Sequence, residues 1–177
     1  MVERQEQVAP DAMMTRIGQA VMLHHGGDRE EARDRLLKLW AEIGEDGTPL
    51  HRCTLAHYMA DTQDDPDSEL AWDLRALSAA DELSDGRPAE HPREHHDELA
   101  VRAFYPSLHL NLATDYAKLG RHDAARSHLR LARGALALLE DDGHGAGVRA
   151  ALARLEARLD ETGPAGGETP GPPRQRP

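Results

Sequence analysis

Three residues on one short stretch carry side chains that could do chemistry. Cys53, His57 and Asp61 follow one another at intervals of four residues, and that spacing places them on one stripe of a helix. Thiolate, imidazole and carboxylate groups are ligands for zinc or copper, and His25 could approach them from a neighbouring helix. The same groups could instead hydrogen-bond a peptide or a small ligand. In the simplest alternative Cys53 is only a packing residue, because free cysteine behaves as a small hydrophobe in most cores.

The stripe also contains the residue types of nucleophilic catalysis. A cysteine nucleophile needs a base and an orienting group that converge on one substrate, whereas a single helix projects Cys53, His57 and Asp61 along parallel lines. The sequence contains no Gly-rich phosphate loop and no nucleophile elbow. We therefore expect no catalytic residues, no required cofactor and a non-catalytic protein.

Composition narrows the classes of partner. The formal net charge of −11 repels phosphate backbones, so we expect no nucleic-acid partner. Apolar runs are too short to cross a bilayer, and the polar start of the chain lacks the apolar segment of a secretory signal. These features predict a cytoplasmic protein without a membrane partner. The excess of arginine over lysine indicates a genome rich in G and C, as in actinobacteria.

The elements that must position these side chains are helical. Aromatic residues make up only 3% of the chain, so the core must be built from Leu and Ala, which favour helices over strands. Apolar spacing is helical between the ends of the chain. It predicts seven helices, near residues 12–25, 28–43, 49–62, 67–83, 96–119, 122–140 and 146–160.

Local signals mark several of the predicted helix ends. Asp28 with Glu31 is typical of a helix start, and Asp67 should begin the fourth helix. Pro106 interrupts the fifth helical pattern and predicts either a kink or the true start of that helix. Residues 1–10 and the Pro/Gly-rich residues 162–177 should be disordered, which leaves one helical domain at 11–161.

Two helix pairs of this domain repeat one another. Six positions match at a constant offset of 93 residues: Ala20, Leu23, Gly27, Ala32, Leu36 and Leu39 align with Ala113, Tyr116, Gly120, Ala125, Leu129 and Ala132. Small residues let the paired helices approach closely, and the glycine can end the first helix in a left-handed conformation. The pattern, clearest in "LATDYAKLGRHDAARSHLRLA", resembles the tetratricopeptide repeat.

The resemblance implies an all-α, right-handed solenoid of three such helix pairs plus a C-terminal capping helix. The repeats would cover about 13–46, 49–83 and 104–139, and the cap 146–160. The middle repeat departs from the pattern, because it lacks the turn glycine and needs extra residues in "QDDPD". The register of its first helix, which carries Cys53 and His57, is therefore open.

The resemblance also implies a function. Proteins of this family usually act as adaptors whose first helices line a concave groove for a protein or peptide. The corresponding candidate partner-binding residues here are Met14, Ile17, Val21, His25, His57, Asp61, Leu110, Asn111, Thr114 and Lys118. The alternative is a metal- or small-ligand-binding protein that uses Cys53, His57, Asp61 and His25 for zinc or copper. Partner identity and oligomeric state stay open.

Overall fold

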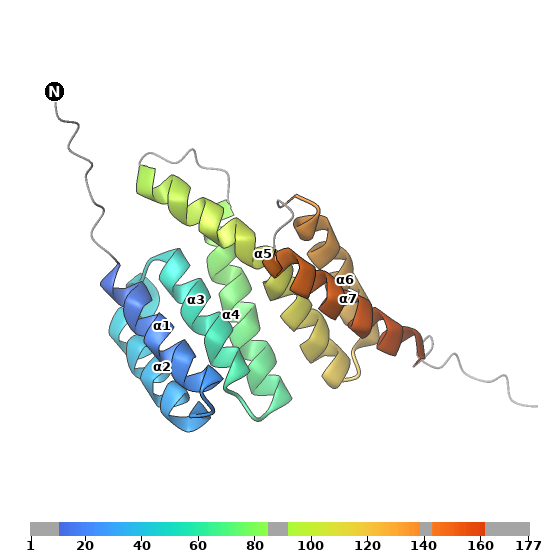
Figure 1. Ribbon diagram of the computed structural model, residues 1–177, viewed down its shortest axis with the longest axis horizontal. Helices are drawn as coiled ribbons and strands as arrows, with labels where there is room; N and C mark the ends of the chain where they lie inside the picture. Colours follow the sequence, from blue (N-terminus) through green and yellow to red (C-terminus); the bar gives the residue numbers. More distant parts are fainter. Residues whose placement is uncertain (1–10, 85–91, 139–142, 162–177) are drawn as a thin grey trace, which may run out of the picture.

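The computed structural model describes residues 11–84, 92–138 and 143–161. The termini that we expect to be disordered, 1–10 and 162–177, lie outside these residues. In the described part the chain forms seven α-helices and one 3-10 helix, with no strand, which confirms the all-α solenoid of helix pairs. The elements are α1 (Ala12–His25), α2 (Arg29–Ile43), η1 (Gly44–Asp46), α3 (Pro49–Asp61), α4 (Pro66–Ser84), α5 (Pro92–Lys118), α6 (His122–Leu136) and α7 (Gly143–Glu161) (Figure 1).

The helices pack as consecutive pairs. α1 contacts α2, α3 contacts α4, and α5 contacts α6, while α7 packs against both α5 and α6. Figure 1 shows α1 to α4 together at one end, α6 and α7 at the other, and the long α5 joining the two groups. Three apolar clusters follow this order along the molecule, the first at α1–α3, the second at α3–α5 and the third at α5–α7.

The turns within the first and third pairs have the same geometry. Gly27 and Gly120 adopt φ values of 96° and 71°, in the left-handed region that glycine occupies without steric cost. This confirms the turn glycines that the repeat predicts. Equivalent hydrogen bonds close both turns, from the Asp28 amide to the Leu23 carbonyl at 2.9 Å and from the Arg121 amide to the Tyr116 carbonyl at 2.8 Å.

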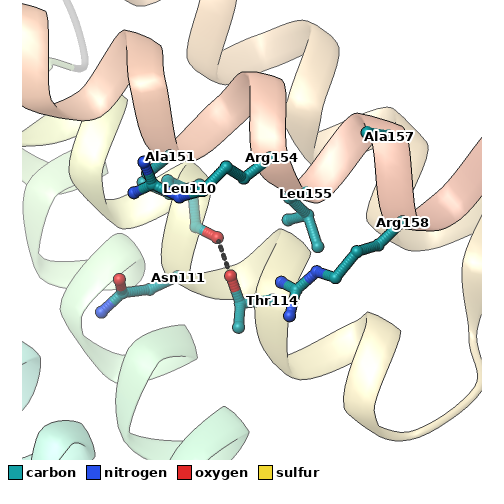
Figure 2. Close-up of a pocket in the computed structure, with 8 residues that line it drawn as sticks. All are labelled: Leu110, Asn111, Thr114, Ala151, Arg154, Leu155, Ala157 and Arg158. Carbon is teal, nitrogen blue, oxygen red and sulfur yellow. Dashed lines mark hydrogen bonds between the residues drawn. The ribbon is translucent and has the colours of Figure 1, made fainter.

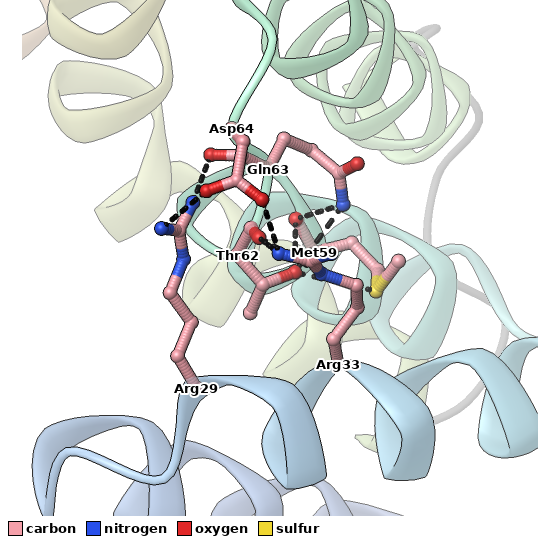
Figure 3. Close-up of polar contacts among 6 residues, drawn as sticks. All are labelled: Arg29, Arg33, Met59, Thr62, Gln63 and Asp64. Atoms are coloured by element: carbon pink, nitrogen blue, oxygen red, sulfur yellow. Dashed lines mark hydrogen bonds and ion pairs between the residues drawn. The ribbon is translucent and has the colours of Figure 1, made fainter.

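The turn between α3 and α4 has no glycine and is held by side chains from α2 (Figure 3). Arg33 donates from Nε to the Thr62 carbonyl at 3.0 Å, and Arg29 donates to the Gln63 carbonyl. Both guanidinium groups also pair with Asp64, at 2.6 Å for Arg29 Nη1 and 2.9 Å for Arg33 Nη2. Carbonyls at a helix C-terminus have no partner inside the helix, so these cations replace the missing glycine motif and tie the first repeat to the second.

Two helix starts differ from the predictions. Asp28 does precede α2, but its side chain makes no capping hydrogen bond. The predicted cap of α4, Asp67, is wrong: α4 begins at Pro66, and the carboxylate of Asp65 accepts from the Ser68 amide at 2.9 Å. Proline is favoured in the first turn of a helix because its missing N–H is not needed there, which moves the cap one residue before it.

The long α5 is the largest departure from the predicted helices. It begins at Pro92, earlier than the expected residue 96, and it continues through the buried Pro106. Its first half therefore extends beyond the helix of a standard repeat. Val101 and Phe104 in this extension pack into the second apolar cluster, against α3 and α4. The extension covers a face of α3 that a simple solenoid would leave open.

None of the described helices combines the length and the apolar character that crossing a bilayer requires.

Candidate functional site

The predicted groove residues of α1 are largely internal. Ile17 is 1% exposed and Val21 is buried, and both lie in the cluster formed with α2 and α3. Met14 packs against the same cluster and is half-buried. The expectation that Ile17 and Val21 contact a partner is therefore incorrect, because the closeness of α3 turns their helix face into core.

Cys53 is fully buried in the second apolar cluster. Burial, with a smaller effect from the negative charges of Asp73 and Asp81, raises the pKa of the thiol to about 12. A thiol in this state is a poor nucleophile and a poor metal ligand, since both roles need the thiolate. Residues of the α5 extension belong to the cluster that buries Cys53. This environment fits the alternative in which Cys53 is only a packing residue.

The proposed metal ligands do not come together. His25 is exposed at the end of α1, Asp61 is exposed at the end of α3, and Cys53 points into the core. Among the described residues, no three His, Cys, Asp or Glu side chains form a group that could hold a metal ion. The geometry thus offers no support for the zinc or copper site that uses Cys53, His57, Asp61 and His25.

His57 instead enters a polar contact with the next helices. It is 9% exposed, and its Nδ1 atom lies 3.7 Å from Oδ1 of Asp73 on α4. The ring also packs edge-on against Phe104 of the α5 extension, with centroids 5.8 Å apart. Asp61 is the last residue of α3. Burial raises the pKa of its carboxyl group, although the residue as a whole is exposed.

A pair of buried carboxyl groups lies between the second and third helix pairs. Asp73 on α4 and Asp115 on α5 are 0% and 1% exposed. Burial, followed by the negative charges of Asp73 and Glu69, raises the pKa of Asp115 to about 8. Two buried carboxylates side by side repel one another, and the raised pKa favours the protonated form of Asp115 at neutral pH.

Two predicted partner-binding residues of α5 surround this pair. Asn111 Nδ2 lies 3.5 Å from both His57 Nδ1 and Asp73 Oδ1. Lys118 Nζ binds Glu69 at 2.6 Å and lies 3.8 Å from Asp115 Oδ1. His57 and Asn111 are therefore in contact, and Lys118 lies further along α5 beside Glu69 and Asp115. They also have partners within the protein, so they stabilise the junction between repeats.

Sequence reasoning missed Asp73 and Asp115, although a signal for both was present. Asp73 lies three residues after the buried Leu70 and three before the buried Ala76. That position is on the core stripe of the helix, where a carboxylate is unusual. A search for acids on apolar stripes would have identified the buried pair.

An open surface lies between α5 and α7. A groove of about 500 Å³ is lined by Leu110, Asn111 and Thr114 from α5 and by Ala151, Arg154, Leu155, Ala157 and Arg158 from α7 (Figure 2). The three α5 residues are predicted partner-binding residues, and the structure brings them together. The Thr114 hydroxyl donates to the Leu110 carbonyl at 2.9 Å. The helix predicted as a plain cap thus forms the second wall of the groove.

Comparison with known proteins places the repeats in two segments. The family model described as tetratricopeptide repeat matches residues 13–38 and 106–131. No curated protein and no solved structure matches the chain, and an actinobacterial source stays a prediction. The matched segments span the glycine turns of the first and third helix pairs. Together they support a tetratricopeptide-repeat protein.

Proposed function

We propose that this chain is a non-catalytic adaptor that binds a protein or peptide partner in the groove between α5 and α7. Tetratricopeptide repeats generally mediate protein–protein interaction, which supports the class of function. A cytoplasmic location remains part of this proposal.

The observation that carries the proposal is the composition of the groove. Leu110, Ala151 and Ala157 supply apolar surface, while Asn111, Thr114 and the two arginines supply polar groups around it. An apolar surface with a few convergent polar groups is typical of a recognition site. The middle of the predicted concave face is less suitable, because its side chains are buried or paired within the protein.

The proposal can be tested with a substitution whose larger side chain fills the groove. Ala151 lines it and Ala153 lies exposed on another face of α7, so Ala151→Trp should block binding whereas Ala153→Trp should not. Proteins retained from a lysate by the wild type and by the two variants are compared by quantitative mass spectrometry. Circular dichroism and thermal unfolding of each variant report whether the fold is kept.

The proposal predicts a set of proteins that Ala151→Trp loses and Ala153→Trp retains. Identical sets for the wild type and a folded Ala151→Trp variant would contradict it, because a blocked groove would then make no difference.

A further inference from the structure

We infer that the groove between α5 and α7 binds an acidic segment of a partner, with Arg154 and Arg158 holding two of its carboxylates. This inference rests on the proposed function, because it names the chemistry of the segment that the groove would take. It goes beyond that function by assigning the specificity to the capping helix rather than to the repeats.

The two arginines are free to act on a partner. Both are exposed and line the groove, and neither forms a hydrogen bond or an ion pair with any other residue that the structure describes. Other arginines of the same region are engaged: Arg133 pairs with Glu156, and Arg126 donates to the Leu159 carbonyl at 3.0 Å. Two unpaired guanidinium groups beside an apolar floor favour carboxylates over neutral side chains.

Their arrangement suits two anionic groups at once. Residues 154 and 158 are one turn apart on α7, a rise of about 6 Å. This rise is measured along the backbone, and the two long side chains reach different parts of the groove. Alternate side chains of an extended peptide are about 6.6 Å apart, so acids two or more residues apart can reach the two guanidinium groups. In Figure 2 Arg158 points toward Thr114, while Arg154 extends toward the Leu110 and Ala151 end of the groove. Leu110 and Ala151 are half-buried along the same groove, where they can pack against apolar neighbours of the acids.

The overall negative charge of the chain does not oppose this assignment. The net charge is −11, but exposed charges more than about 8 Å apart are largely screened at physiological ionic strength. A carboxylate in direct contact with the guanidinium groups therefore responds mainly to them. The net charge instead slows the long-range encounter with an acidic segment, so binding should depend on short-range contact with the two arginines.

The test uses a random peptide library displayed on phage and selected on the full chain. Selection is repeated on the Arg154→Gln/Arg158→Gln variant and on Ala151→Trp. The control is Arg121→Gln/Arg130→Gln, which removes two positive charges from exposed residues of another surface, outside the groove. Individual peptides are then measured by fluorescence anisotropy, with glutamine replacing each acid in a second set.

The inference is supported if the selection yields acidic peptides that the wild type and the control double variant bind with equal affinity. Their affinity should fall by about tenfold or more in Arg154→Gln/Arg158→Gln, and Ala151→Trp should abolish binding. Peptides that Ala151→Trp blocks but that lack acids, or that tolerate the loss of both arginines, would overturn this inference and leave the proposed function intact. If no selected peptide is sensitive to Ala151→Trp, the groove is not a peptide site and both proposals fail.

Discussion

Replacing Asp115 with asparagine should change how the stability of this protein depends on pH. Asp115 is 1% exposed, and burial with the charges of Asp73 and Glu69 raises its pKa to about 8, despite the opposing effect of Lys118. An aspartate in the unfolded chain has a pKa of about 3.9. Between these two values the folded protein holds a proton that the unfolded chain releases.

The sign and the size of the effect follow from this difference. Because the folded state binds the extra proton, its contribution to stability is complete below about pH 4 and is lost as the pH rises toward 8. The slope is about 1.4 kcal/mol per pH unit, so raising the pH from 5.5 to 7.5 should cost up to about 3 kcal/mol. Asparagine has nearly the same shape and can still donate a hydrogen bond to Asp73, but it does not titrate.

The assay is urea unfolding followed by far-ultraviolet circular dichroism at pH 5.5, 6.5 and 7.5. The Asp115→Asn variant should gain about 2 to 3 kcal/mol relative to the wild type between the first and the last pH. Asp123→Asn serves as the matched control, because Asp123 is fully exposed, and its difference from the wild type should stay constant. A constant difference for Asp115→Asn as well would refute the raised pKa of Asp115.

Three further predictions concern other parts of the fold. His109 and His128 face one another with their Nδ1 atoms 3.1 Å apart, and burial lowers the pKa of both. The contribution of this pair to stability should therefore be lost as the pH drops below about 6.5, so His128→Gln should gain stability relative to the wild type over that range, as urea unfolding would measure. The buried thiol of Cys53 should resist an aromatic disulfide reagent at pH 8 in the native protein and react fully in urea. Rapid labelling of the native protein would contradict the burial of Cys53. Gly120→Ala should destabilise the protein by about 1 kcal/mol, because Gly120 has a φ of 71°. Gly134→Ala should stabilise it by about 0.5 to 1 kcal/mol, because Gly134 lies inside α6 with open space around it. Equal shifts of the melting temperature for the two variants would contradict this contrast.

The sequence by itself determined the helix pairs and their turns. Apolar residues at helical spacing place the helices, and glycine at the two turns allows the left-handed backbone that ends α1 and α5. Both signals act over a few residues, so they can be read without knowing the rest of the molecule. The offset of 93 residues then carried over to the structure, where Gly27 and Gly120 close equivalent turns.

Only the tertiary structure decided what each face of those helices touches. The stripe of Cys53, His57 and Asp61 was correctly placed on one helix, but the α5 extension buries the first, engages the second and leaves the third exposed. The helical period shows that residues share a face, yet it does not show whether another helix covers that face.

The buried carboxyl pair and the groove depend on the same kind of long-range contact. Asp73 and Asp115 are 42 residues apart in the chain and meet because α4 packs against α5. Arg154 and Arg158 become groove residues because α7 packs beside α5 as well as α6. These placements result from the packing of whole helices, whose relative positions are set by many weak apolar contacts and not by any local motif.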